Sequence, residues 1–492
     1  MEQETVLHIE GTVEQVLYRN EQNGYTVLDL DANGTLITVV GELGDVEEGE
    51  QLSVDGTYVN HVRFGVQFQA QYVERKLPED AINIQRYLSS GVIKGIGSAL
   101  AKKIVTAFGS QTLEIMEKQP TRLMEIRGIS PKKCEAIAQE VQKIFALRSL
   151  MLFLQQYNIR SRYAMRAYQC YGSGAKEMIL ANPYLLCGMG IELPFEKAEI
   201  LADDLKVPKN AEQRILAGTC YILEHNTHNG YTCLPLDRLQ PKVCEYLQVS
   251  ESEFLSAYQA AQKEGNLVSY QKETREFVYL PAYYEAEQYI ADRIGVLRDF
   301  SAPEDQEIYL DLIKREETEQ GIQYAELQRK AILSALSRGL LILTGGPGTG
   351  KTTTLNGMIS LFEKQGYQVM LAAPTGRAAQ RISDLTGYEA KTIHRLLEVE
   401  FDMAGATKFR HNESNPLTCD VMIVDEMSMV DVLLFESLLR ALRFSCKLIM
   451  VGDSDQLPSV GAGNVLKDLI DSGQVPVVAL NQTAKLHCYE CP

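Results

Sequence analysis

The sequence lacks the features that mark secreted and membrane proteins. No apolar run approaches the roughly 20 residues that are needed to cross a bilayer. The first ten residues, Met1–Glu10, have neither a basic start nor an apolar stretch, which excludes a secretory signal peptide. The sequence therefore predicts a cytoplasmic protein. At 492 residues, the chain is long enough for roughly three domains.

The sequence also lacks a disulfide framework. Its ten cysteines are scattered through segments that read as helices and strands, unlike the dense cysteines of small secreted folds. We expect reduced, mostly buried thiols. One Cys-x-x-Cys pair, Cys488 and Cys491, has no second pair beside it, so a zinc site is the less favoured interpretation there.

Positive charge is outweighed overall: 48 Lys and Arg stand against 65 Asp and Glu, and the net charge is −17. An acidic surface repels a polyanion, which argues against a general nucleic-acid binder. However, residues 86–166 hold 14 Lys or Arg against five Glu and no Asp, a local balance of +9 that leaves −26 for the remainder. Such a contrast favours a localised DNA- or RNA-binding face over the alternative, a solvated helical surface.

Changes in periodicity divide the chain into five parts. The first reads as a small β-barrel, OB-like, with short alternating runs at 6–9, 25–30, 36–40 and 52–58 and turn signals at Asn23-Gly24 and Asn33-Gly34. Whether this barrel binds DNA, binds protein or only stabilises its neighbours stays open. The expected parts are an OB-like barrel (1–78), an all-α helix-hairpin-helix region (79–205), a helical or winged-helix-like linker (206–315), an α/β RecA-like P-loop domain (316–478) and an aberrant tail (479–492).

The helical region contains two similar units, Leu88–Val105 and Leu123–Val141, and a weaker third at Asn182–Ala202. Each reads as helix, glycine-containing turn and helix, and resembles a helix-hairpin-helix motif. Such a turn presents backbone N–H groups to a phosphate without reading sequence; the alternative is an ordinary α-hairpin. Candidate DNA-binding residues are Lys94, Gly95, Gly97, Lys102, Arg127, Gly128 and Lys132, with Lys103 and Lys133 adding charge nearby.

The linker, residues 206–315, alternates helical runs with one expected hairpin, Leu267–Leu280. Helices followed by a hairpin are typical of a winged-helix unit. Its charge is not notably basic, so a packing or linking role is at least as well supported as nucleic-acid binding.

A complete phosphate-binding motif follows a predicted buried strand at 340–343. The motif G-x-x-x-x-G-K-T runs from Gly345 to Thr352, and a helical pattern follows it, which is the context of a true P-loop. Lys351 is expected to neutralise the β- and γ-phosphates of ATP, and the Thr352 hydroxyl to hold Mg²⁺. The predicted nucleotide-binding residues here are Gly345, Gly346, Pro347, Gly348, Thr349, Gly350, Lys351, Thr352 and Thr353.

Acidic and amide side chains follow two further predicted strands. Asp425 and Glu426 come directly after the strand 421–424, where ligands bind in parallel sheets. We expect Asp425 to support Mg²⁺ through water and Glu426 to orient and deprotonate the attacking water. Gln456, after the strand 448–451, is placed to sense the γ-phosphate, and Asp453 to brace the site.

A separate group follows the predicted strand 369–372. Pro374, Thr375 and Arg377 lie between this strand and a helical run. Hydroxyl, backbone N–H and guanidinium groups in this position are able to hold a nucleic-acid phosphate. The alternative makes Arg377 an ordinary surface charge.

Together these segments resemble the motor of superfamily-one helicases, and most closely the RecD-like ATP-dependent DNA helicases of the long bacterial form. The resemblance rests on GGPGTGKTTT (345–354), APTGRAA (373–379), TIHRLL (392–397), VDEMSMVD (424–431) and VGDSDQLPSVGAGNVL (451–466). It adds Gln328 as an adenine contact and His394 as a DNA contact. The N-terminal barrel and hairpins also resemble that subfamily, so the likeness covers nearly the whole chain.

The resemblance implies an ATP- and Mg²⁺-dependent motor that acts in DNA repair and recombination. It would move 5′ to 3′ along single-stranded DNA and separate duplexes at junctions, by opening and closing a cleft between two RecA-like domains. A P-loop enzyme of another kind, such as a small-molecule kinase, is disfavoured because it would not need both the 374–377 and the 452–458 segments.

The sequence departs from the family after residue 478. Residues 479–492 show no clear period and do not match the family's continuation, as a frameshift or truncated gene would produce. The second RecA-like domain, with its arginine that reaches the γ-phosphate, is then expected to be missing. Two interpretations follow: a helicase chain that does not unwind by itself, or a truncated ATP- and DNA-binding protein without motor activity.

Overall fold

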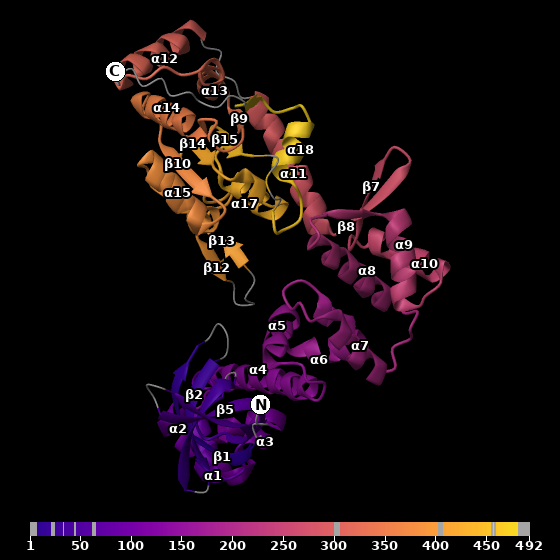
Figure 1. Cartoon of the computed structure of the whole chain (residues 1–492). Helices are drawn as coiled ribbons and strands as arrows, with labels where there is room; N and C mark the ends of the chain where they lie inside the picture. The colour runs from indigo at the N-terminus through magenta and orange to yellow at the C-terminus, as the bar shows by residue number, and fades with distance from the viewer. Residues whose placement is uncertain are drawn as a thin grey trace. The chain divides into compact units, whose positions relative to one another are not determined.

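The computed structural model describes residues 7–20, 25–32, 34–43, 46–61, 65–299, 306–401, 407–453, 456 and 459–480. These form two compact units, one ending at Val207 and one beginning at Pro208 (Figure 1). Among the described residues, no helix is long and apolar enough to span a membrane. The predicted turn Asn23-Gly24, Asn33 and the tail beyond Leu480, which includes Cys488 and Cys491, lie outside the described residues.

The first unit begins with a closed five-stranded barrel in the order β1-β2-β3-β5-β4, which confirms the predicted OB-like fold. Alternate side chains point inward, among them Val13, Leu28, Val39 and Phe68, each fully buried. The fourth run and the segment after it pair as an antiparallel ladder from Gln51↔Lys76 to His61↔Gly65. The strands are β1 (Leu7–Arg19), β2 (Tyr25–Ala32), β3 (Thr35–Glu42), β4 (Gln51–His61) and β5 (Gly65–Lys76).

The rest of this unit is helical, as predicted. The turns of the two stronger hairpins contain Gly95 and Gly128, whose positive φ angles of 94° and 111° favour glycine. The elements are α1 (Ala81–Ser89), α2 (Ser98–Phe108), η1 (Gly109–Gln111), α3 (Thr112–Lys118), η2 (Pro120–Glu125), α4 (Pro131–Gln155), α5 (Ser161–Tyr171), η3 (Gly172–Gly174), α6 (Ala175–Ala181), η4 (Pro183–Cys187) and α7 (Phe195–Asp204).

The second unit opens with the helices and hairpin that the sequence predicts for a winged-helix-like unit. The hairpin strands pair from Val268↔Tyr279 to Lys272↔Arg275, and a short third strand completes the sheet order β6-β8-β7. The elements are α8 (Glu212–Thr227), β6 (Cys233–Pro235), α9 (Leu236–Leu247), α10 (Glu251–Lys263), β7 (Val268–Lys272) and β8 (Arg275–Tyr279). A long helix, α11 (Pro281–Asp299), leads from it to the next sheet.

The remainder of the second unit is a parallel six-stranded sheet with the order β11-β10-β14-β15-β9-β16. Its strands are β9 (Leu340–Thr344), β10 (Val369–Ala373), β11 (Ala390–Thr392), β14 (Val421–Val424), β15 (Lys447–Gly452) and β16 (Val477–Ala479). Its helices are α12 (Gln306–Gln320), α13 (Glu326–Ser337), α14 (Lys351–Lys364), α15 (Gly376–Thr386), α16 (Ile393–Leu397), α17 (Val432–Ala441) and α18 (Val465–Asp471). A short hairpin, β12 (Val399–Phe401) and β13 (Thr407–Phe409), and a turn, η5 (Met427–Met429), complete the unit.

Helices cover both faces of this sheet, as a parallel sheet requires. Alternate strand residues pack on opposite sides: Ile342 and Met450 face α11, α16, α17 and α18, whereas Leu341 and Ile449 face α12, α13, α14 and α15. The sequence shows this only as continuous apolar runs. This two-sided burial fixes the strand ends, where the polar candidates lie.

Two glycines in long helices are expected to change the stability in opposite directions when each is replaced by alanine. A Cβ at Gly357 in α14 would lie 2.2 Å from the buried Tyr324 hydroxyl, whereas one at Gly295 in α11 would meet nothing within 4 Å. We expect Gly357→Ala to destabilise the second unit by about 1–3 kcal/mol and Gly295→Ala to stabilise it by about 0.5–1 kcal/mol. Thermal unfolding of the intact chain measures both; equal shifts would contradict the packing around Tyr324.

The eight described cysteines are free thiols, as predicted. Three are buried: Cys134, Cys419 and Cys446. The expectation of mostly buried thiols is therefore only partly confirmed, because four others are half-buried and Cys170 is exposed. Cys419 and Cys446 lie beside each other with their Sγ atoms 3.7 Å apart.

Candidate nucleotide site and nucleic-acid interface

The P-loop lies where the sequence predicts it, between β9 and α14. Gly348 and Gly350 adopt positive φ angles of 77° and 89°, and Gly350 is the residue from which α14 starts. A Cβ on Gly345 would lie 2.6 Å from the Leu480 carbonyl oxygen. Glycine is therefore required for the loop to curl over the helix N-terminus, whose unpaired N–H groups attract phosphate.

The Lys351 side chain is held inside this loop. Its Nζ donates to the carbonyl oxygens of Gly345 and of Gly346, the latter at 3.2 Å. The Thr349 hydroxyl also donates to Gly346, at 2.9 Å. These contacts hold the ammonium group among the backbone groups that would surround a phosphate chain.

Three neighbouring strands end beside the P-loop. Because β15 lies between β9 and β14 in the sheet, their carboxyl ends meet at one edge. A cavity of about 100 Å³ opens there. It brings together all five of the predicted catalytic and Mg²⁺ residues, and its lining consists of Pro347, Lys351, Thr352, Leu355, Arg381, Ile382, Leu385, Asp425, Glu426, Gly452, Asp453 and Gln456.

The two acidic residues after β14 differ in environment. Burial raises the pKa of Asp425 above its usual value, and the neighbouring Glu426 carboxylate adds to the shift, while Lys351 opposes it. Glu426 adopts a left-handed backbone conformation, φ 53°, and its carboxylate lies 3.5 Å from Nη1 of Arg381. Asp425 is therefore a desolvated carboxylate and Glu426 a paired one.

The donors around the cavity suit Mg²⁺. A hydroxyl from Thr352 and a half-buried carboxylate from Asp425 are hard oxygen ligands of the kind that Mg²⁺ prefers. Both line the same cavity as Lys351, and a divalent cation would offset the burial that raises the pKa of Asp425. Within the described residues, no group of three or more His, Cys, Asp or Glu side chains forms a separate metal site.

Gln328 lies beside the P-loop but is already hydrogen-bonded. Its side chain is buried, its Nε2 donates to the Gly350 carbonyl at 3.4 Å, and its Oε1 accepts from the Ala325 N–H at 2.9 Å. The amide is thus oriented at the start of α13. Its role as an adenine contact stays a prediction.

Gln456 lines the cavity, and its backbone N–H donates to the Asp453 carbonyl at 3.2 Å. The neighbours of Gln456 in the motif, 454–455 and 457–458, lie outside the described residues. Asp453 is buried directly after β15, and its bracing role stays a prediction.

The predicted DNA contacts of the motor domain gather at the outer end of the same sheet edge. Ala373 pairs with Thr392 across β10 and β11, so Pro374, Thr375 and Arg377 emerge next to His394. The Thr375 hydroxyl accepts from the Ala378 N–H at 3.2 Å and so caps α15. Arg377 and His394 are exposed, and their contact with DNA stays a prediction.

Sequence reasoning missed Arg381. It lies one helical turn after Arg377 on α15, lines the nucleotide cavity and reaches Glu426. The spacing of four residues was the available signal, because residues i and i+4 share a helix face. Arg381 therefore connects the helix that carries the predicted DNA contact Arg377 with Glu426, the predicted catalytic carboxylate.

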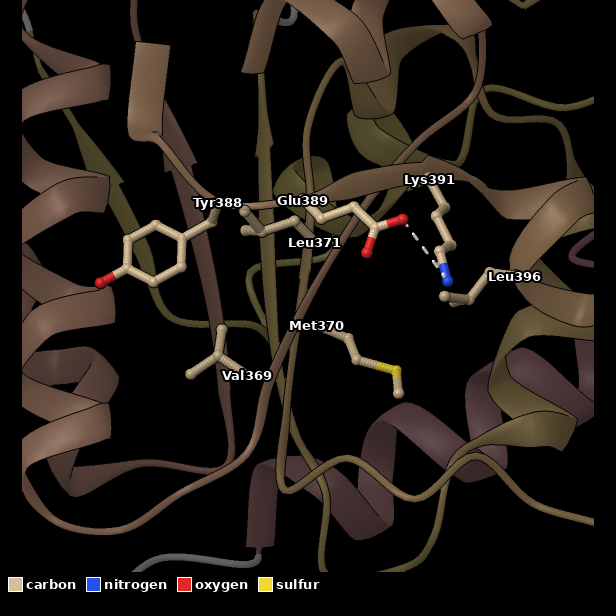
Figure 2. A pocket seen from close by; sticks show the side chains of 7 residues that line it. All are labelled: Val369, Met370, Leu371, Tyr388, Glu389, Lys391 and Leu396. Atoms are coloured by element: carbon tan, nitrogen blue, oxygen red, sulfur yellow. Dashed lines mark ion pairs between the residues drawn. The ribbon is translucent and has the colours of Figure 1, made fainter. Parts of the chain in front are cut away.

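A larger cavity, about 250 Å³, lies elsewhere, against the first half of β10 and the segment that leads into β11 (Figure 2). Its mouth carries the ion pair Glu389–Lys391 at 3.7 Å. None of the predicted site residues lines it; the lining is Val369, Met370, Leu371, Tyr388, Glu389, Lys391 and Leu396.

Family comparisons match four segments of the chain, which lie between residues 6 and 233 and between 328 and 462. Residues 6–78 match the OB-fold domain of the ATP-dependent DNA helicase YrrC, and residues 86–143 a SAM-like helix-hairpin-helix tandem. Residues 143–233 match the HHH domain of the ATP-dependent RecD2 DNA helicase, and residues 328–462 an AAA domain. The weaker third hairpin thus falls within a helix-hairpin-helix match.

Comparisons with whole proteins cover different shares of the chain. The chain is 29% identical to the ATP-dependent RecD2 DNA helicase of Deinococcus radiodurans over 96% of its own length and 67% of that protein. It is 44% identical to the RecBCD enzyme subunit RecD of Mycolicibacterium smegmatis over 30% of each chain. Among solved structures, the Bacteroides sp. Pif1 helicase overlaps 33% of this chain and 43% of its own, at 23% identity and a TM-score of 0.24. The chain is therefore similar to the RecD2-like ATP-dependent DNA helicases over nearly its whole length.

Proposed function

We propose that this chain is the ATP-hydrolysing and DNA-holding part of a helicase. The observation that carries the proposal is the cavity that joins Lys351, Thr352 and Asp425 with Glu426 and Gln456 at one sheet edge. Lys351 would neutralise the phosphates, Thr352 and Asp425 would hold Mg²⁺, and Glu426 would activate the attacking water. Gln456 would report the loss of the γ-phosphate.

DNA would be held at two places, each within one unit. The hairpins of the first unit would bind backbone phosphates through Lys94, Lys102, Arg127 and Lys132 and the turn glycines Gly95, Gly97 and Gly128. In the second unit, Pro374, Thr375, Arg377 and His394 would contact a single strand. The resemblance to RecD-like helicases supports movement from 5′ to 3′ and a role in DNA repair and recombination.

We propose further that the chain by itself does not unwind a duplex. Every described residue that lines the nucleotide cavity comes from one RecA-like domain, and the one arginine among them, Arg381, lies beside Glu426. An arginine that reaches the γ-phosphate from a second domain contributes about 10³- to 10⁵-fold to the rate in related phosphoryl transfers.

A strand-displacement assay tests this statement. A tailed duplex is incubated with the purified chain and Mg-ATP, and the release of the short strand is followed. We expect DNA binding without displacement. ATP-dependent displacement would overturn the proposal, whereas a chain that binds DNA but not Mg-ATP would be a DNA-binding protein without motor chemistry.

A further inference from the structure

The helical region is an internal duplication. Helices α2 and α5 have the same length and begin at Ser98 and Ser161, 63 residues apart. The elements after them keep the same offset: η1 and η3, α3 and α6, and the starts of η2 and η4. Gly109 and Gly172, which follow α2 and α5, both adopt positive φ, 57° and 66°. The sequence shows only a faint trace of this repeat.

The duplication predicts four hairpin turns where the sequence indicates three. In each turn a residue with positive φ is followed by an isoleucine that is at most 7% exposed. The four pairs are Gly95 and Ile96, Gly128 and Ile129, Asn158 and Ile159, and Gly190 and Ile191. The third turn escapes notice because asparagine, which tolerates this conformation, replaces glycine.

The first copy leaves its turn cations free. Six Lys and Arg side chains flank its two turns, and within the described part of the chain none of these side chains forms an ion pair or hydrogen bond. They are Lys94, Lys102, Lys103, Arg127, Lys132 and Lys133. The two cations between α2 and the second turn, Lys118 and Arg122, pair with neighbouring glutamates at 3.0 and 3.2 Å.

The cations of the second copy, between its first turn and α7, are all engaged. Arg160 lies 3.9 Å from the Glu42 carboxylate of the barrel. Arg162 donates to the Tyr163 hydroxyl at 3.0 Å, and Lys176 to the Ser149 hydroxyl at 2.9 Å. Arg166 donates to the Ile191 carbonyl at 3.2 Å. These side chains brace the copy internally and against the barrel.

The second turn of the second copy, residues 188–191, contains no lysine or arginine. Met189 stands at the position that Arg127 occupies in the first copy, and its side chain is 84% exposed. Glu192 follows the turn with positive φ, 59°, and lies 3.6 Å from Arg166. Helix α7 then carries one lysine, Lys197, among four acidic residues, Glu196, Glu199, Asp203 and Asp204. An acidic helix start opposes a phosphate.

We infer that the two copies have diverged: the first binds the DNA backbone, and the second is a structural brace that does not. This inference rests on the proposed DNA binding by the helical region and assigns it to one of two similar-looking units. A free lysine or arginine that neutralises a DNA phosphate releases counterions from the DNA. A side chain that already holds an internal partner would have to break that contact before it could bind a phosphate.

Two double variants of the intact chain, each lacking two cations, test the inference. One double variant, Lys94→Ala with Arg127→Ala, removes two cations from the first copy. The other, Arg160→Ala with Arg162→Ala, removes two cations from the second copy. Binding to a fluorescent tailed duplex is measured over a salt series. We expect the first double variant to reduce the slope of log affinity against log salt by about 2 and the second to leave it unchanged.

Thermal unfolding of both variants is also measured, because loss of the Arg160–Glu42 contact can lower stability without changing the salt dependence of DNA binding. Equal reductions of the slope by the two variants would overturn the divergence and leave DNA binding by the region intact. No change from either would overturn the proposed DNA contact of the hairpins as well.

Discussion

Lys351→Ala is expected to lower Mg-ATP hydrolysis by about 100-fold or more. The ammonium group lies inside the P-loop, within reach of the Gly345 and Gly346 carbonyl oxygens, and lines the same cavity as Asp425. Its removal takes away the one lysine among the described residues around that cavity. Phosphate release by the purified chain, at saturating Mg-ATP, measures the effect.

Lys314→Ala is the matched control. Lys314 lies on α12 of the same unit, its side chain is 73% exposed, and it makes a surface ion pair with Asp311 at 3.6 Å. Exposed pairs of this kind contribute little, so hydrolysis should stay unchanged. DNA binding by both variants should match the unaltered chain, because neither lysine is among the proposed DNA contacts of either unit. Equal hydrolysis by Lys351→Ala and the control would remove the P-loop from the mechanism.

Asp425→Asn should produce two effects of opposite sign. Hydrolysis should fall about 100-fold, because the amide cannot support Mg²⁺ as the carboxylate does. Thermal stability should rise, because burial raises the pKa of Asp425. A carboxyl group with a raised pKa in the folded state favours folding when protonated, and loses that contribution as the pH rises through its folded pKa. At neutral pH the desolvated, charged Asp425 carboxylate therefore lowers the free energy of unfolding, and asparagine removes this penalty.

The pH dependence checks the same assignment. The stability difference between Asp425→Asn and the unaltered chain should be largest at neutral pH and shrink as the pH falls and Asp425 becomes protonated. A variant that melts earlier at neutral pH would show that Asp425 is stabilised by partners in the ligand-free fold.

The nucleotide site was predictable because its parts follow strands. The P-loop and the Asp425-Glu426 pair each sit directly after a short apolar run, and parallel strands bring their carboxyl ends together. Arg381 was not predictable in the same way. Its contact with Glu426 depends on how α15 packs beside β14, which no local pattern reports.

The fold shows a similar contrast. Four barrel strands were named as alternating runs, whereas the fifth, β5, was not named, although Gln67, Gln69 and Gln71 alternate there with apolar residues in the period of a strand. In the helical region, turn glycines revealed two hairpins clearly and a third faintly, but Asn158 hid the fourth. Charge counting treated Arg160 and Lys94 alike, and only the structure shows that Arg160 already has a partner, Glu42.

Steady-state ATP hydrolysis by the intact chain, with and without single-stranded DNA, tests the central claim most directly. We expect Mg²⁺-dependent hydrolysis that rises when DNA is added and disappears in Lys351→Ala. A hydrolysis rate that does not change when DNA is added, or that stays the same in Lys351→Ala, would contradict a DNA-coupled nucleotide site at the shared edge of β9, β15 and β14.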